Sequence, residues 1–135
     1  MTKIALDTNI LIYGHFIDNK EKQTIARDLL SRQPFVSTQV ISEYLNVMKR
    51  LLKSIATKED LLDLCSQWMK GCTIHSIHIA TIQTAKRLIA RYDFQIFDSL
   101  IVASALETGC EILYSEDMQH NMLVERQLTI INPFI

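Results

Sequence analysis

The stretch KIALDTNILIYG, at residues 3–14, decides the fold of this chain. Its first apolar run, at residues 4–6, is typical of a short buried strand, and the run ends at the carboxylate of Asp7. Apolar character returns at residues 10–12, and we predict a helix from about Asn9. Burying an unpaired charge is costly. The position of Asp7 between two buried segments therefore suggests a functional reason for its charge.

Strands and helices are predicted to alternate along the rest of the chain. Short apolar runs predict strands at residues 3–6, 35–37, 73–77, 111–114 and 128–131. Helical spacing predicts helices from about residue 9 to a loop at 17–19, and then over 22–32, 38–54, 58–69, 78–92 and 97–108. We expect Pro34 to end one helix, Thr38 to cap the next, and Gly109 to close the last. This alternation indicates an α/β fold with a parallel sheet that helices cover on both faces. Ligands of such sheets bind at the carboxyl ends of the strands.

Length and composition favour one globular domain, residues 1–135, with 48% apolar and 21% charged residues. The net charge of −1 gives no overall attraction toward nucleic acid or acidic membranes, so nucleic-acid binding would need a local basic patch. No apolar run reaches the roughly 18 residues of a membrane span, and no signal-peptide pattern is visible. We therefore expect a soluble, cytoplasmic protein with no membrane partner.

Neither the cysteines nor the histidines show the spacing of a metal site. The three cysteines contain no C-x-x-C pair and are expected to be small buried side chains in a reducing compartment: Cys65, Cys72 and Cys110. The four histidines are scattered along the chain and are expected to have structural or surface roles: His15, His75, His78 and His120.

Four carboxylates break the apolar pattern at Asp7, Glu43, Asp98 and Asp117. One interpretation is structural, because Asp7, Asp98 and Asp117 are each well placed to cap a helix, where an Asp contributes about 1 kcal/mol. Glu43 does not fit that interpretation, since it lies inside its helix on the apolar stripe.

The second interpretation is that the four carboxylates converge. Two of them follow strands of the predicted parallel sheet, and the other two lie on helices that must pack beside it. Clustered carboxylates repel one another and raise their own pKa values, and a divalent cation removes this conflict. Oxygen-only ligands suit Mg²⁺ or Mn²⁺ rather than Zn²⁺. Such a site can activate water and neutralise charge on a phosphodiester.

Four motifs in this order resemble those of PIN-domain ribonucleases, and most closely the VapC-like toxins of bacterial toxin–antitoxin pairs: LDTNILIY, ISE, FDSLIVASAL and YSEDMQH. The resemblance covers essentially the whole chain. It implies a three-layer α/β/α sandwich with a central parallel sheet, and a Mg²⁺- or Mn²⁺-dependent endoribonuclease acting on RNA. It also implies a homodimer and a cognate antitoxin partner that blocks the site. By motif, the acidic quartet that binds metal and performs catalysis falls on Asp7, Glu43, Asp98 and Asp117, with Asn9 and Ser115 in supporting roles.

The sequence departs from the family pattern at two points. The last motif commonly continues to a Gly where this chain has Asn121, which puts the turn after Asp117 in doubt. Glu116 and Asp117 are adjacent, so either can be the fourth acid. Asp117 is favoured because the pattern places its acid two residues after Ser115.

One other enzyme class fits the sequence less well than this nuclease. A haloacid-dehalogenase-like phosphatase would have a second acid two residues after Asp7, where this chain has Asn9. Two alternatives remain open: an RNA-processing PIN nuclease without an antitoxin, and a catalytically silent module that binds a metal or a partner through the same acids.

Overall fold

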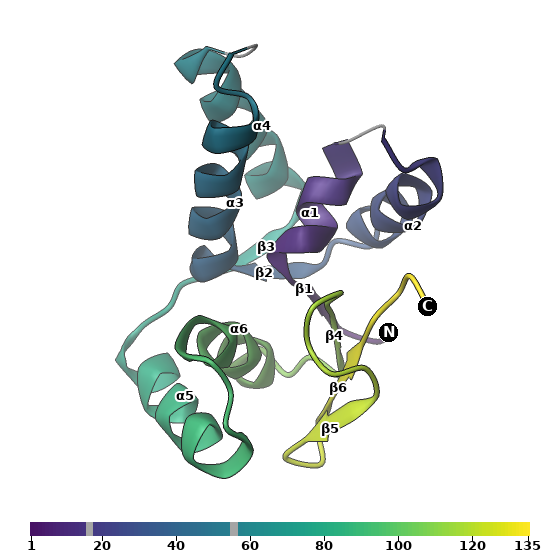
Figure 1. The fold of residues 1–135 in the computed structure, drawn as a ribbon. Coiled ribbons are helices and arrows are strands. Elements are labelled where there is room, and N and C mark those ends of the chain that lie inside the picture. The colour runs from purple at the N-terminus through teal and green to yellow at the C-terminus, as the bar shows by residue number, and fades with distance from the viewer. Residues whose placement is uncertain (16–17, 55–56) are drawn as a thin grey trace.

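The computed structural model describes residues 1–15, 18–54 and 57–135. Over these residues, six strands form one sheet and six helices flank it (Figure 1). The strands are β1 (Ile4–Leu6), β2 (Phe35–Ser37), β3 (Thr73–His75), β4 (Ile112–Tyr114), β5 (Met122–Val124) and β6 (Leu128–Ile131). The helices are α1 (Thr8–His15), α2 (Lys20–Leu30), α3 (Thr38–Leu51), α4 (Lys58–Gly71), α5 (Ile79–Tyr92) and α6 (Ile96–Glu107). Helices α1 to α4 lie on one side of the sheet and α5 and α6 on the other, which confirms the three-layer α/β/α fold.

The first strand lies in the interior of the sheet, as its uniformly apolar sequence requires. The strand order is β3-β2-β1-β4-β6-β5, and β1 pairs in parallel with β2 and with β4. Leu6 pairs with Tyr114, and Ser37 pairs with His75. Since these strands are parallel, the residues that follow them emerge at one edge of the sheet.

The sheet is parallel except at β5, which the sequence analysis did not predict. This strand pairs antiparallel with β6, and Val124 lies opposite Leu128. The middle residue of β5, Leu123, is exposed, so the strand has no buried apolar run. Its turn places Glu125 and Arg126 at φ values of 49° and 58°, where Asn-Gly is the usual sequence signal. The strand is a three-residue apolar run, Met-Leu-Val, but its turn lacks the Asn-Gly signal that would identify a hairpin.

Several predicted helix starts differ from the observed starts by one or two residues, as for α1, α2, α5 and α6, while the predicted start of α4 at residue 58 is correct. Ser37 caps α3, because its side-chain hydroxyl accepts a hydrogen bond from the backbone N–H of Val40 at 3.2 Å, and Thr38 is the first helical residue. The same helix ends at Leu51 rather than at residue 54. Asp98 is the third residue of α6 and not its cap. The predicted loop at 17–19 lies partly outside the described residues.

Helix α6 is the most deeply packed helix beside the sheet. It buries a run of mostly small residues, Ile101–Ala105 in sequence order I-V-A-S-A, which allows close approach to β2 and β4. A helix that is apolar nearly all round belongs in a core. This packing fixes the N-terminal turn of α6, and with it Asp98, near the end of β1. None of the helices in the described ranges is both long and apolar enough to cross a membrane.

Candidate metal centre

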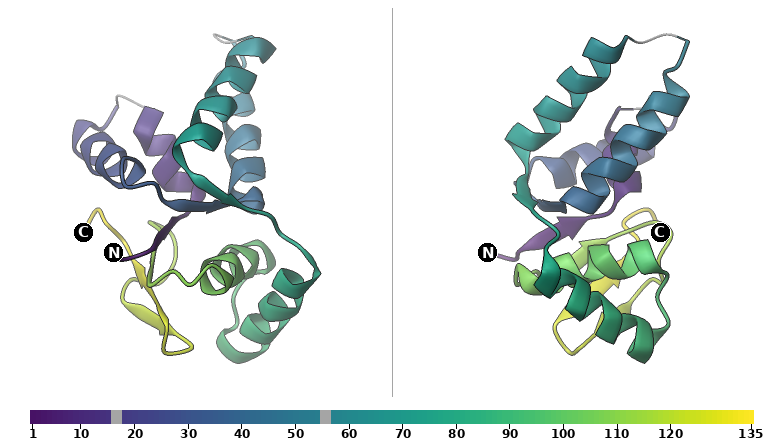
Figure 2. Two further views of the ribbon diagram at one scale, coloured as in Figure 1. Left: turned by 180° about the vertical axis from the view of Figure 1, so that it is seen from behind. Right: turned by 90° about the vertical axis from the view of Figure 1, so that its left-hand side faces the viewer.

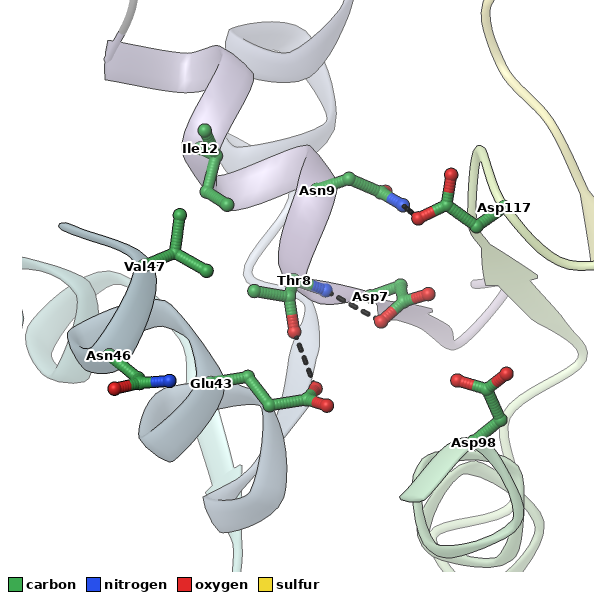
Figure 3. A pocket seen from close by; sticks show the side chains of 9 residues that line it. All are labelled: Asp7, Thr8, Asn9, Ile12, Glu43, Asn46, Val47, Asp98 and Asp117. Carbon is green, nitrogen blue, oxygen red and sulfur yellow. Dashed lines mark hydrogen bonds between the residues drawn. The ribbon is translucent and has the colours of Figure 1, made fainter. Parts of the chain in front are cut away.

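A pocket of about 330 Å³ opens where β1 ends and α1 begins. Figure 3 shows the side chains that surround it: Asp7, Thr8, Asn9, Ile12, Glu43, Asn46, Val47, Asp98 and Asp117. The four carboxylates come from the end of β1, from α3, from α6 and from the loop after β4. The structure therefore brings together all four acids that the sequence singled out.

Asp7 is the most buried of the four acids, with only 6% of its surface exposed. The backbone N–H of Thr8 donates to Asp7 Oδ1 at 2.7 Å, and the Ser115 hydroxyl donates to Asp7 Oδ2 at 2.7 Å. Burial raises the pKa of Asp7; these two hydrogen bonds oppose the rise, while the charges of Asp98 and Asp117 add to it. Each carboxylate oxygen has a second lone pair free for a cation.

Glu43 and Asp98 face the same pocket from opposite sides. The Thr8 hydroxyl donates to Glu43 Oε2 at 2.9 Å and so fixes the direction of that carboxylate. Burial raises the pKa of Glu43, and the charge of Asp7 raises it further. Burial also raises the pKa of Asp98, together with the charges of Glu43 and Asp117. The acids thus repel one another, as expected of carboxylates gathered at a cation site.

The structure places the adjacent acids Glu116 and Asp117 in different surroundings. Asp117 lines the pocket, and the Asn9 side-chain amide donates to its Oδ2 at 3.2 Å. Glu116 is occupied elsewhere: it forms an ion pair with Lys22 and accepts a hydrogen bond from the Tyr13 hydroxyl at 2.7 Å. Burial alone would raise the pKa of Glu116, but these partners lower it.

The turn after Asp117 keeps the backbone shape that a glycine would give. Asn121 has a φ of 65°, in the left-handed region that glycine prefers and asparagine tolerates. Asn121, which stands where the family motif commonly has a glycine, can therefore adopt the backbone conformation of this turn. Asn9 strengthens the same loop, because its carbonyl oxygen accepts from the backbone N–H of Glu116 at 3.3 Å.

Thr8 and Asn46 also line the pocket, although the sequence motifs do not single them out. Asn46 follows Glu43 by three positions, so helical spacing alone placed it on the same face. Thr8 gave no signal beyond its position next to Asp7. Sequence reasoning also treated the histidines as scattered, but His75 and His78 converge with Glu107, so that one ligand atom from each lies within 4.8 Å of the others.

The donor set of the pocket fits a hard divalent cation. Among the described residues, none of the ion pairs involves Asp7, Glu43, Asp98 or Asp117. Four carboxylates without a cationic side chain would leave a cluster of uncompensated negative charge. Because the ligands are all oxygen atoms, Mg²⁺ or Mn²⁺ suits the site better than Zn²⁺.

Known proteins share this architecture. The three solved structures that follow are from bacteria. A toxin–antitoxin complex from Klebsiella pneumoniae is 18% identical, with 98% of each chain covered and a TM-score of 0.71. The DNA-bound VapBC complex from Salmonella typhimurium is 16% identical, covers 96% of this chain and 97% of that one, and has a TM-score of 0.69. VapC20 of Mycobacterium tuberculosis, a toxin that cleaves the sarcin-ricin loop, is 14% identical, with coverages of 85% and 90% and a TM-score of 0.66.

A comparison with curated protein sequences gave no match. The family model described as "PIN domain" matches residues 4–122, which include all four pocket carboxylates and most of the sheet. The chain therefore belongs to the PIN domain family.

Proposed function

We propose that this protein is a Mg²⁺- or Mn²⁺-dependent endoribonuclease and the toxin of a toxin–antitoxin pair. The observation that carries the proposal is the convergence of four carboxylates at the carboxyl edge of a parallel sheet, with no cation paired to them among the described side chains. Membership of the PIN domain family supports nuclease chemistry at that pocket.

Asp7 and Asp98 would hold the cation directly, and Glu43 and Asp117 would hold its waters or a second, more weakly bound ion. When bound, the cation lowers the pKa of a water molecule and neutralises charge on the scissile phosphate. The protein contributes orientation: Ser115 directs Asp7, Thr8 directs Glu43, and Asn9 directs Asp117. These hydrogen bonds position the carboxylates before substrate arrives.

The chemistry at the cleaved ends tests this route. Attack by water on the phosphodiester leaves a 5′-phosphate and a 3′-hydroxyl, and the ribose 2′-hydroxyl takes no part. Mass spectrometry of the products should find these ends with either metal. Products that carry a 2′,3′-cyclic phosphate would mean that the 2′-hydroxyl is the nucleophile, and the proposal would be wrong.

A protein partner is supported by the surface of the helix pair α3 and α4, which lie side by side (Figure 2). A groove of about 400 Å³ between them is lined by apolar and basic side chains: Leu45, Lys49, Leu52, Lys53, Lys58, Leu61 and Leu62. Leu62 is 55% exposed and adds to the apolar surface of this groove, and contiguous apolar surface of this kind is typical of a protein contact. We propose an antitoxin and a second copy of the chain as partners, as in a cytoplasmic toxin–antitoxin complex. Light scattering of the purified chain, alone and with its antitoxin, measures both associations.

A further inference from the structure

A second group of potential metal ligands lies apart from the carboxylate pocket. His75 is the last residue of β3, His78 immediately precedes α5, and Glu107 is the last residue of α6. Their side chains meet so that one potential ligand atom from each lies within 4.8 Å of the other two. None of the three lines the carboxylate pocket.

The hydrogen bonds of His78 define which ring nitrogen carries a proton. Its Nδ1 lies 3.0 Å from the carbonyl oxygen of Ser76, which can only accept. The same nitrogen lies 3.1 Å from the Thr81 hydroxyl, which donates its own proton to Glu107 Oε2 at 2.8 Å. Both neighbours therefore accept, so Nδ1 is the donor. In the neutral ring, Nε2 then has a free lone pair.

His75 is held in a similar way. Its Nδ1 lies 2.7 Å from the hydroxyl of Ser104, a buried residue of α6, while its Nε2 faces Glu107. Metal-binding histidines commonly use one ring nitrogen for such a hydrogen bond and the other for the metal. The two rings thus turn the same atom, Nε2, toward one carboxylate.

Glu107 Oε2 is the point on which the two rings converge. It lies 3.4 Å from Nε2 of His75 and 4.0 Å from Nε2 of His78. The Ser104 hydroxyl can either donate to or accept from Nδ1 of His75, so Nε2 of His75 can carry either a proton or a lone pair. A lone pair on either Nε2 would repel the carboxylate, and a metal ion bound between the groups removes that repulsion. The Thr81 hydroxyl is fully buried and holds the carboxylate in place.

We propose that His75, His78 and Glu107 form a transition-metal site, with Zn²⁺ as the preferred ion. Two imidazole nitrogens and one carboxylate oxygen are borderline-soft ligands that suit Zn²⁺ and disfavour Mg²⁺. Tetrahedral ligands at about 2.0–2.1 Å from Zn²⁺ lie about 3.3 Å apart. One pair is already near that spacing, and the exposed His78 ring can close the rest. A water completes the fourth position.

The site would join three elements that are far apart in sequence. It links the edge strand β3 to the paired helices α5 and α6, on the other side of the sheet from α3 and α4. Its ligands differ in kind from the all-oxygen carboxylate pocket, so the proposal does not depend on the nuclease proposal. Each can fail without the other.

The test is a Zn²⁺ titration of the Asp98→Asn protein, in which the carboxylate pocket is weakened. We expect one Zn²⁺ per chain by calorimetry. We also expect imidazole nitrogen NMR spectra in which Nε2 of His75 and of His78 shifts, while the resonances of His15 and His120 stay in place. Co²⁺ in the same site should give the visible absorption bands of a four-coordinate ion.

Three substitutions complete the experiment. Ser104→Ala, which removes the hydroxyl behind His75, should lower the Zn²⁺ affinity about 10- to 100-fold. His78→Ala and Glu107→Gln each remove a ligand and should lower the Zn²⁺ affinity at least as much. In Glu107→Gln, the amide oxygen can still accept the hydrogen bond from the Thr81 hydroxyl, so the contact between α5 and α6 is kept. His120→Ala is the matched control and should bind Zn²⁺ like its parent.

Circular dichroism establishes that each variant is folded. The proposal is overturned if Zn²⁺ fails to bind, or if it binds with unchanged affinity after His78→Ala and Glu107→Gln. It is also overturned if the two Nε2 resonances stay in place. In those cases the cluster is a hydrogen-bonded histidine–carboxylate contact without a metal.

Discussion

At the scale of single residues, the central feature is the buried carboxylate of Asp7. Asp7 lies at the end of an interior strand, and its neighbours supply hydrogen bonds without supplying a positive charge. If stability were the only requirement, we would expect either a cationic partner for Asp7 or an uncharged residue at this position. A cation in the pocket, as proposed above, would offset the repulsion among the four carboxylates. In the metal-free protein, repulsion among the carboxylates should therefore lower the free energy of unfolding at pH values where they are ionised.

The first prediction is a pH effect on the metal-free protein. Burial raises the pKa values of Asp7, Glu43 and Asp98 in the folded state above their ordinary values of 3.8 for Asp and 4.5 for Glu. Between the ordinary pKa values of these acids and their raised values in the folded state, the folded protein binds more protons than the unfolded chain. The free energy of unfolding therefore falls as pH rises through this range. We expect Asp7→Asn to make this fall smaller.

Urea unfolding in EDTA at a series of pH values measures the effect. The comparison removes the titration of Asp7 together with its repulsion of Glu43, while acids with lowered pKa values away from the pocket contribute equally to both proteins. Asp63→Asn, which changes an exposed acid outside the pocket, is the control and should keep the wild-type pH dependence. Identical slopes for wild type and Asp7→Asn would contradict the raised pKa of Asp7.

Glu116 illustrates how neighbouring acids can have separate roles. Its ion pair with Lys22 and its hydrogen bond from Tyr13 tie the loop after β4 to α1 and α2. Lys22 also lies 4.7 Å from the centre of the Tyr13 ring and 5.3 Å from that of Phe134. The loop that delivers Asp117 is thus anchored from the residue before it.

The second prediction is that Lys22→Ala slows RNA cleavage more than it destabilises the fold. The ion pair is partly exposed, so its loss should change the free energy of unfolding only slightly. A small displacement of Asp117 should lower the cleavage rate about 10- to 100-fold. Arg32→Ala removes another ion pair of α2, with Asp28, and should leave cleavage unchanged. Equal rates for Lys22→Ala and wild type would show that the loop needs no such anchor.

At the scale of elements, short strands and well-defined helix starts place the pocket. Helix α3 begins directly after β2, and the Ser37 cap sets the rotation that brings Glu43 toward the sheet edge. The sequence pattern identified both elements but assigned the cap to Thr38. Both hydroxyl residues suit a cap, and only the backbone angles at the strand end decide between them. The Thr38 hydroxyl accepts instead from the backbone N–H of Ile77.

The third prediction tests that cap. Ser37→Ala leaves the N–H of Val40 without its acceptor at a buried helix start, and should lower the free energy of unfolding by about 1 kcal/mol. Ser42→Ala removes an exposed hydroxyl in the same helix and should change it by about 0.5 kcal/mol or less. Chemical denaturation compares the two. Equal effects would mean that Ser37 does not cap the helix.

At the scale of the whole molecule, the sequence predicts the central strands and helices better than it predicts the edge of the sheet. The apolar runs at β1 and β4 and the apolar helix α6 were strong signals, because each is buried in the centre of the fold. The antiparallel strand β5 lies at an edge of the sheet, and its short apolar run Met-Leu-Val is joined to β6 by a turn without a glycine, so no hairpin signal marks it. Residues that are distant in sequence, such as His75, His78 and Glu107, could be brought together only by the fold.

The acidic cluster was predictable for a different reason. Each of its members interrupts an apolar segment or ends a strand, and chain topology alone brings such positions to one edge of the sheet. Glu116 could not be distinguished from Asp117 by residue type. The decision lay in a contact between Glu116 and Lys22, which are separated by 94 residues.

The fourth prediction concerns the stability of the complete fold. If the pocket binds Mg²⁺ or Mn²⁺ only in the folded state, the metal should raise the free energy of unfolding by about 2.7 kcal/mol at 100 times its dissociation constant. Asp98→Asn should reduce this gain, and Asp63→Asn should keep it. Thermal melts across a metal titration give the answer. A melting temperature that does not respond to either metal would contradict a metal centre.

The most direct measurement is RNA cleavage by the purified protein with Mg²⁺, with Mn²⁺ and with EDTA, using a panel of transfer, ribosomal and messenger RNA. Wild type and Asp63→Asn should cleave at least one RNA with metal and none in EDTA. Asp98→Asn keeps the size of the side chain and removes its charge, so it should lose cleavage while remaining folded. Cleavage that persists in EDTA, or that survives in Asp98→Asn at the wild-type rate, would contradict a nuclease built on these carboxylates.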